Sequence, residues 1–231
     1  MLFRSRRGAP IFAILHGGWW QDLSIDYTAA PAPAVVGAGA LWASIGYTLA
    51  PNVSLREIVA EVSAAVATLA AHAVDLGGDP SRIVLAGHSA GAHLAAMQLT
   101  ALAAEASRRS VAALLLIGGA YDLAPIAESY VNEKVRMSAA DAADLSPALL
   151  TPLHDVPVRV RVGEEEPEEF HRNAALLVER WAPSLTAIDS AALAGRDHFD
   201  ALDELADPRG GLFSDALDLL GLPPQRTAVG R

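Results

Sequence analysis

The sequence predicts an α/β fold in which a mostly parallel sheet carries helices on both faces. Short apolar runs rich in branched side chains alternate along the chain with longer stretches of helical periodicity, an order that is typical of βαβ units. The 231 residues suit one domain of this class, and a hydrophobic content of 52% is enough to fill a sizeable core. We therefore expect residues 1–231 to form a single domain, with a small cap in the segment 121–153.

The expected elements follow from local patterns, since apolar runs predict strands and helical spacing of apolar residues predicts helices. Ser54, for example, suits the N-cap of a long helix. The apolar face of that helix contains Ile58, Val62, Val66 and Leu69. Strands are expected at 10–15, 41–48, 82–86, 111–117, 156–162 and 185–193. Helices are expected at 55–75, 92–101, 168–181 and 213–220, and the segment 121–153 is expected to be mostly helical.

Charge and composition exclude several classes of function. The net charge is −10, with 17 Lys and Arg against 27 Asp and Glu, and no basic block occurs beyond residues 4–7. Nucleic acid is therefore not an expected partner. The chain has no cysteine, which excludes disulfides, zinc–thiolate sites and a cysteine nucleophile.

Neither a signal peptide nor a membrane span is expected. The arginines before Pro10–Leu15 resemble the start of a signal peptide, but this apolar run has six residues, whereas the core of a signal has about 7–15. No segment approaches the roughly 18 uninterrupted apolar residues of a membrane span. We therefore expect a cytoplasmic protein without a membrane partner.

The pentapeptide Gly-His-Ser-Ala-Gly at 87–91 is the most informative motif in the sequence. The apolar run 82–86 precedes it as an expected strand, and 92–101, which contains neither Gly nor Pro, follows it as an expected helix. A G-x-S-x-G turn between a strand and a helix is the nucleophile elbow of α/β hydrolases. Its glycines clear space around the turn, and the N–H groups at the start of the helix favour negative charge. Ser89 is therefore the candidate nucleophile.

A glycine-rich loop follows the first of these expected strands. The sequence His-Gly-Gly-Trp-Trp at 16–20 begins directly after the apolar run 10–15. In α/β hydrolases the corresponding loop supplies backbone N–H groups to the oxyanion hole, together with the residue after the nucleophile. The alternative is an ordinary turn whose tryptophans pack in the core. The expected donors are the N–H groups of Gly17, Gly18, Trp19 and Ala90.

A serine nucleophile needs a histidine base and an acid that orients it, and in this fold the chain order is Ser, acid, His. Of the seven histidines, His198 is the candidate base, because it lies in a loop just after the last expected strand. The candidate acids follow the strand 156–162 in a run of three glutamates at 164–166, although such a run is also typical of a solvated turn. Asp122, after the preceding strand, is the alternative acid.

Several segments together resemble the serine-hydrolase type of kynurenine formamidase (arylformamidase), within the esterase/lipase superfamily of α/β hydrolases. The resemblance covers about residues 10–200 in order. It is carried by His-Gly-Gly-Trp-Trp-Gln at 16–21, the elbow and its helix at 87–97, Tyr-Asp-Leu-Ala-Pro-Ile at 121–126, Glu-Phe-His-Arg at 169–172 and Asp-His-Phe at 197–199.

The resemblance implies hydrolysis of a small-molecule substrate, N-formylkynurenine, to kynurenine and formate by a Ser-Asp-His triad that uses neither a cofactor nor a metal. The family's serine corresponds to Ser89 and its histidine to His198. Its acid lies three residues after the strand-end glycine and corresponds to Glu166, where this sequence has Glu for Asp; Glu165 is the alternative. The family's tryptophan corresponds to Trp20, and Trp20 and Trp19 are both candidates for stacking on an aryl substrate.

The sequence differs from this family before the glycine-rich loop. Such hydrolases have antiparallel strands before the glycine-rich loop, and only 15 residues precede His16, so we expect the sheet to lack its first N-terminal strands. An uncovered edge strand favours association, so a homodimer is an expected assembly.

The same triad would serve a carboxylesterase acting on small acyl esters. A non-catalytic binding protein with a hydrolase fold is the second alternative.

Overall fold

Seven strands of the described residues form one sheet, in the order β1-β3-β2-β4-β5-β6-β7. The computed structural model describes residues 2–3 and 8–224, so the basic stretch at 4–7 lies outside the described residues. Neighbouring strands from β3 to β7 are all parallel, which confirms the α/β fold with a mostly parallel sheet. The strands are β1 (Leu2–Phe3), β2 (Ala9–Leu15), β3 (Leu41–Ile45), β4 (Gly78–His88), β5 (Val111–Ile117), β6 (Val158–Gly163) and β7 (Ile188–Leu193).

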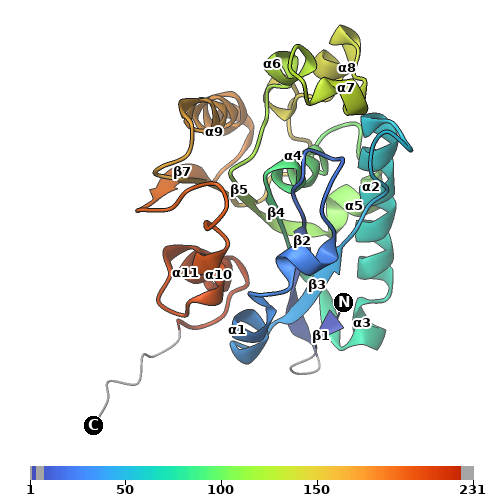
Figure 1. The fold of residues 1–231 in the computed structure, drawn as a ribbon. Helices are drawn as coiled ribbons and strands as arrows, with labels where there is room; N and C mark the ends of the chain where they lie inside the picture. Colours follow the sequence, from blue (N-terminus) through green and yellow to red (C-terminus); the bar gives the residue numbers. More distant parts are fainter. Residues whose placement is uncertain (1, 4–7, 225–231) are drawn as a thin grey trace.

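The sheet is expected to lack its first N-terminal strands, but the structure has one short strand, β1, at the edge beside β3. The two-residue strand β1 pairs antiparallel with β3, Leu2 opposite Ala43 and Phe3 opposite Trp42. In the described chain, the parallel strands are therefore preceded by a short antiparallel strand on the side of β3. Figure 1 shows β1 at this edge, beside the N-terminus.

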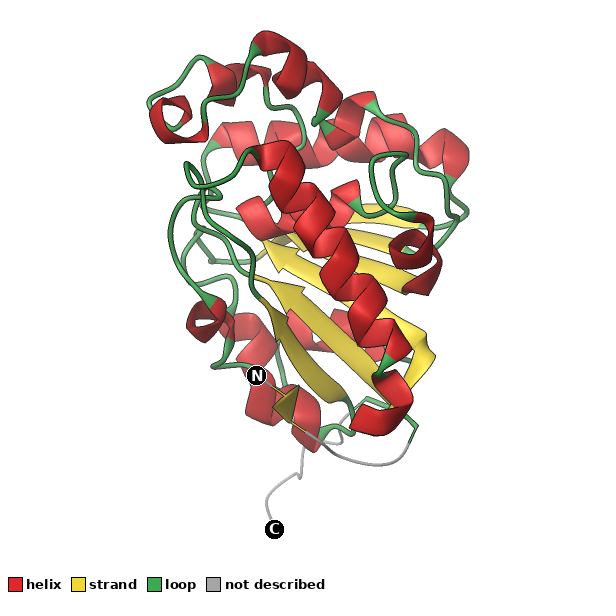
Figure 2. Ribbon diagram, turned by 90° about the vertical axis from the view of Figure 1, so that its right-hand side faces the viewer, coloured by secondary structure: helices red, strands yellow, loops and turns green. Residues whose placement is uncertain are grey.

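Alternation along the central strands sends side chains into two separate cores. Along β2, Ile11 and Leu15 belong to the core that includes residues of α2 (Leu55–Ala71), α4 (Ala90–Met97) and α9 (Glu168–Trp181). Phe12 and Ile14 belong to the core that includes residues of α1 (Ala32–Gly37), α10 (Asp203–Ala206) and α11 (Gly211–Leu219). All four side chains are fully buried, as expected for a strand that is covered on both faces. Figure 2 shows helices on both sides of the sheet.

The helices are short apart from α2 and α9. They are α1 (Ala32–Gly37), α2 (Leu55–Ala71), α3 (Ala73–Leu76), α4 (Ala90–Met97), α5 (Glu105–Ser110), α6 (Ala124–Ala127), α7 (Asn132–Val135), α8 (Ala139–Asp144), α9 (Glu168–Trp181), α10 (Asp203–Ala206) and α11 (Gly211–Leu219), with 3-10 turns η1 (Ile25–Thr28), η2 (Pro147–Leu149) and η3 (Ala182–Ser184). Within the described residues, no helix is both long enough and apolar enough to cross a membrane.

Several elements differ from the sequence patterns. The expected strand 41–48 ends at Ile45. The expected helix 55–75 is interrupted at His72, whose backbone (φ −101°, ψ 4°) is not helical, so α2 and α3 are separate. The patterns do not predict α5, because its six residues, Glu-Ala-Ser-Arg-Arg-Ser, lack an apolar period.

The segment 121–153 is expected to be mostly helical with polar interruptions, and it contains the short helices α6, α7 and α8 and the turn η2, joined by loops. Figure 1 shows α6, α7 and α8 together at the end of the molecule opposite α3. Since α3 leads into the start of β4, these three helices lie toward the end at which β4 finishes. That position suits a cap, and the function of the segment as a cap stays a prediction.

Candidate active site

Ser89 occupies a strained turn between β4 and α4. Its backbone has φ 55° and ψ −120°, a conformation that costs a non-glycine residue on the order of 1–3 kcal/mol. The flanking glycines give the turn its space: a Cβ on Gly87 would lie 2.1 Å from the carbonyl oxygen of Gly91, and a Cβ on Gly91 would lie 2.2 Å from that of Leu15. The Ser89 N–H donates to the carbonyl oxygen of Ile117 on the neighbouring strand (2.8 Å). Any side chain at either glycine would therefore displace the serine.

A continuous chain of hydrogen bonds joins Ser89, His198 and Glu166. Nδ1 of His198 lies 2.7 Å from Oε2 of Glu166, and Nε2 of His198 lies 3.0 Å from Oγ of Ser89. A carboxylate only accepts, so the Nδ1–H donates to Glu166 and Nε2 accepts from the serine hydroxyl. The three residues come from the turns after β4, β6 and β7, and parallel strands bring those turns to one edge of the sheet. The arrangement sets the imidazole tautomer that a general base requires.

Glu166 is the carboxylate that lies at this edge. Its side chain has no exposed surface, and its other oxygen, Oε1, accepts from the N–H of Gly163 at the end of β6 (2.8 Å). Both oxygens therefore have donors, as a buried carboxylate needs. Glu165 is exposed, and Asp122 forms an ion pair with an arginine of α9 (3.1 Å). Neither of these two side chains is hydrogen-bonded to His198 in the described chain.

The glycine-rich loop passes directly beside the nucleophile. A Cβ on Gly17 would lie 3.1 Å from Cβ of Ser89, so the backbone of the loop touches the serine. Gly18 and Trp19 have positive φ values, 98° and 50°, which turn the chain sharply at this point. Among the hydrogen bonds of the described residues, none has the N–H of Gly18, Trp19 or Ala90 as its donor. These N–H groups are therefore available to a bound anion. The N–H of Ala90 is free in this way because it lies in the first turn of a helix.

Trp20 is fully buried beneath this loop, so the prediction that it stacks on a substrate is wrong. Its Nε1–H donates to Nδ1 of His93 (3.2 Å), and the Nε2–H of His93 donates to the carbonyl oxygen of Leu145 (2.8 Å). Burial lowers the pKa of His93 to about 4, so its ring is neutral at neutral pH and makes both of these hydrogen bonds. Trp20 thus anchors the loop that carries Gly18 and Trp19.

Phe170 on α9 brings an aromatic surface against His198. Its ring centroid lies 4.5 Å from that of His198 and 6.5 Å from that of Trp19. Phe170 and Trp19 are both partly exposed, and the ring of Phe199, 5.7 Å from that of His198, is 80% exposed. Aromatic rings therefore surround the accessible part of the imidazole. In the sequence, Phe170 has no signal of its own beyond its place in the Glu-Phe-His-Arg segment at 169–172.

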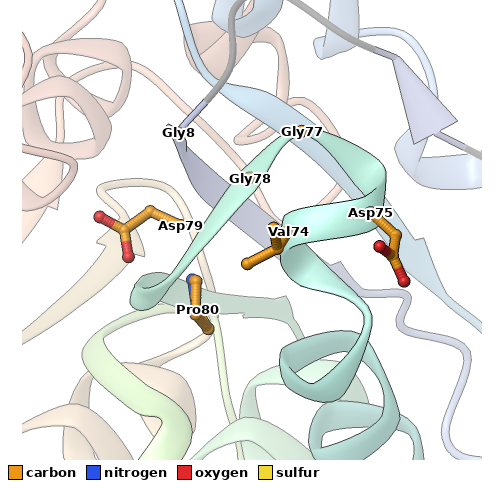
Figure 3. Close-up of a pocket in the computed structure, with 7 residues that line it drawn as sticks. All are labelled: Gly8, Val74, Asp75, Gly77, Gly78, Asp79 and Pro80. Atoms are coloured by element: carbon orange, nitrogen blue, oxygen red, sulfur yellow. The ribbon is translucent and has the colours of Figure 1, made fainter.

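A surface hollow lies at the other end of β4 from Ser89. Figure 3 shows Asp75 and Asp79 on its rim, with their carboxylates pointing away from each other. The carboxylate of Asp79 accepts from the N–H and the hydroxyl of Ser81 (2.9 and 2.7 Å). Within the described residues, no three His, Asp or Glu side chains gather into a group that could hold a metal ion. The hollow is thus separate from the Ser89 site.

The order of the sheet, its two covered faces and the elbow between β4 and α4 define an α/β hydrolase. A family model described as an alpha/beta hydrolase fold matches residues 12–174, and the chain belongs to this family. Together with the enzymes to which the chain is similar, this membership makes the protein a hydrolase.

Curated relatives include three kynurenine formamidases, which confirms the resemblance inferred from the sequence segments. The enzyme of Salmo salar is 29% identical over 223 residues, covering 92% of this chain and 73% of the relative. That of Drosophila melanogaster is 27% identical over 220 residues, covering 86% and 69%. Carboxylesterase NlhH of Mycobacterium tuberculosis is 38% identical over 93 residues, covering 40% of this chain and 29% of the relative.

Solved structures agree with this family. A protein of Silicibacter sp., provisionally assigned as a thioesterase, superimposes with a TM-score of 0.83 at 32% identity, covering 92% of this chain and 78% of the other. Esterase 2 of Thermogutta terrifontis has a TM-score of 0.78 at 20% identity, covering 97% and 90%. At that identity, the likeness to the esterase concerns the fold alone.

Proposed function

We propose that the protein is a serine hydrolase that cleaves small acyl amides, specifically an arylformamide such as N-formylkynurenine. The observation that carries this proposal is the aromatic surface of Phe170 against His198, the residue positioned to protonate a leaving group. The kynurenine formamidases among the relatives support the same substrate class.

In the first step, His198 takes the proton of the Ser89 hydroxyl through Nε2 as Oγ attacks the formyl carbonyl. The carbonyl oxygen becomes an oxyanion, which accepts hydrogen bonds from the N–H groups of Gly18, Trp19 and Ala90, with Gly17 lining the same loop. Glu166 keeps the imidazole in the correct tautomer and stabilises the imidazolium that forms.

In the second step, the tetrahedral intermediate breaks its C–N bond, and the arylamine leaves with the proton from His198 Nε2. The enzyme then holds a formyl ester on Ser89. Water attacks this ester with His198 as the base, formate is released, and the serine hydroxyl is restored.

The leaving group has to lie next to His198 Nε2 to receive this proton, and that requirement places it among aromatic rings. Phe170 and Phe199 both pack on the imidazole, and Trp19 adds a third ring next to Phe170. Offset or edge-on contacts with an aryl ring add about 0.5–1.5 kcal/mol beyond area burial. An arylamine therefore suits this side of the site better than an aliphatic amine.

The second candidate function is a carboxylesterase acting on small acyl esters. It is favoured by the match to carboxylesterase NlhH, which is 38% identical over 93 residues. The same three residues would perform ester hydrolysis without change, because the carbonyl of an ester is less stabilised by resonance than that of an amide and is attacked more easily.

The two functions are separated by comparing kcat/KM for N-formylkynurenine with kcat/KM for p-nitrophenyl acetate and butyrate. We expect a higher kcat/KM for the formamide. A higher value for the esters, with little turnover of the formamide, would establish the esterase. If neither is turned over and a fluorophosphonate does not label Ser89, the proposed function is wrong.

A further inference from the structure

His88, the residue before the nucleophile, is buried against the loop that carries His198. It ends β4 and is only 2% exposed. Its ring centroid lies 4.8 Å from that of His198, and its Nε2 lies 2.8 Å from the backbone carbonyl oxygen of His198. The side chain of one elbow residue therefore contacts both the ring and the backbone of the neighbouring histidine.

The partner of His88 defines its protonation. A carbonyl oxygen only accepts, so Nε2 carries the hydrogen and donates it. Nδ1 then holds a lone pair, and in the described chain it has no hydrogen-bond partner. Burial, and secondarily the neighbouring His198, lowers the pKa of His88 to about 3. The ring is therefore a neutral donor at neutral pH.

This hydrogen bond gives His198 a second point of attachment to the elbow. Its ring is held to Ser89 through Nε2 (3.0 Å), and its backbone is held to the preceding residue, His88, through the carbonyl oxygen (2.8 Å). Some other hydrogen bonds of this turn are local, since the Asp197 carboxylate accepts from the N–H groups of Phe199 and Asp200. Others lead to the turn after β6, where the Glu165 N–H donates to the carbonyl oxygen of Arg196 (2.9 Å) and the Gly195 N–H donates to the Glu164 carboxylate (2.8 Å). His88 is thus the side chain that ties the histidine loop to the strand that presents the nucleophile.

We propose that His88 is a positioning residue for the reaction, holding the His198 backbone at the distance from which its imidazole reaches both Ser89 and Glu166. The inference rests on the proposed function, in that His198 acts as the base. A displacement of about 1 Å in a catalytic group can cost on the order of 100-fold in rate. If His88 contributed only packing, an apolar side chain of similar size would replace it without loss of activity.

The test compares His88→Phe and His88→Leu, which remove the donor, with His88→Gln, whose amide can still donate. His72→Phe, at an exposed position, is the matched control. We expect the two variants without a donor to lose about 10- to 100-fold in kcat with little change in KM. The rate at which a fluorophosphonate labels Ser89 should fall in parallel. His88→Gln should recover most of both, while thermal midpoints stay close to that of the unmodified protein.

Two results would overturn the positioning role. One is full kcat and full labelling rate in a folded variant without a donor. The other is a similar loss in all three variants, including His88→Gln, accompanied by a matching fall in thermal midpoint or by failure to fold, since His88 would then be a packing residue. Failure of the proposed function looks different: the unmodified protein itself would not be labelled at Ser89. If it is labelled but does not hydrolyse the formamide, the His88 test proceeds on the labelling rate.

Discussion

Gly118 and Glu166 lie so close together that no side chain fits between them. A Cβ on Gly118 would lie 2.9 and 3.1 Å from the two carboxylate oxygens of Glu166, and 3.1 Å from Nδ1 of His198. The backbone at Gly118 also has φ +53°, which L side chains rarely adopt. The backbone of the turn after β5 therefore packs directly against both the Glu166 carboxylate and the His198 imidazole.

Gly118→Ala should lower both stability and activity. The left-handed backbone costs a non-glycine residue on the order of 1–3 kcal/mol, and the added methyl group would push Glu166 away from His198. Gly8→Ala is the matched control, because Gly8 has φ +71° but no atom within 4 Å of its Cβ position. Urea unfolding and kcat should show a stability loss in both variants and at least a 10-fold loss of kcat only for Gly118→Ala. Equal activity of the two would contradict the account.

Substitutions of the carboxylates should identify the acid. Glu166→Gln offers an amide to the imidazole and favours the wrong tautomer, a change that costs about 10⁴ in kcat for the equivalent substitution in a serine protease. Glu166→Asp shortens the side chain by one methylene, so it cannot keep both the 2.7 Å contact to His198 and the 2.8 Å contact to the Gly163 N–H. We expect the largest loss of kcat for Gln and a smaller one for Asp.

Glu165→Gln and Asp122→Asn serve as controls for this series, because neither carboxylate is hydrogen-bonded to His198 in the described chain. Both should retain kcat close to that of the unmodified protein. A larger loss in Glu165→Gln than in Glu166→Gln would reassign the acid.

Local motifs predict the nucleophile and the histidine, because Ser89 and His198 follow from a short motif and from chain order. The acid is different: composition alone leaves three adjacent glutamates, and only the fold shows that Glu166 is buried while Glu165 is exposed. The two adjacent tryptophans are likewise equivalent in the sequence. Their backbones, with φ 50° and 61°, send one side chain into the core and leave the other partly exposed.

The remaining contacts join residues that are distant in the chain, which no local pattern reports. Phe170 reaches His198 from a helix that begins after β6, and His88 reaches the carbonyl oxygen of the same residue from 110 positions earlier. Periodicity predicts that α9 is amphipathic, but not which residue of its exposed side meets the imidazole. The sheet could be predicted from sequence, whereas these side-chain partners depend on how the turns are folded.

Phe170→Leu should reduce the preference for aromatic leaving groups. Leucine keeps much of the apolar surface but loses the ring contact, which is worth about 0.5–1.5 kcal/mol. The ratio of kcat/KM for phenyl acetate to kcat/KM for ethyl acetate should therefore fall by about 2- to 12-fold. Phe170→Tyr retains the ring and should retain the ratio. An unchanged ratio in the leucine variant would show that the aromatic surface does not contact the leaving group.

The free energy of unfolding should fall as the pH drops below about 6.5, the pKa of histidine in an unfolded chain. In the folded protein, burial lowers the pKa of His88 to about 3 and that of His93 to about 4. The unfolded chain therefore takes up these protons first, so stability is complete above about pH 7 and is lost progressively toward about pH 4. Each histidine contributes a slope of about 1.4 kcal/mol per pH unit within this window.

Urea unfolding at several pH values between about 7.5 and 5 measures this slope. His93→Gln removes one of the buried histidines, so the slope of its unfolding free energy against pH should be smaller by about 1.4 kcal/mol per pH unit, the contribution of one proton. Identical slopes in the unmodified protein and in His93→Gln would contradict the burial of a neutral imidazole beneath the glycine-rich loop.

The most direct test of the account is the hydrolysis of N-formylkynurenine by the unmodified protein and by Ser89→Ala, followed through the absorbance of kynurenine. Ser89→Ala keeps the fold of the elbow but removes the oxygen that lies 3.0 Å from Nε2 of His198. We predict turnover by the unmodified protein and its loss in the variant. Equal turnover by both would contradict the assignment of Ser89 as the nucleophile, and no turnover by the unmodified protein would contradict the formamidase activity.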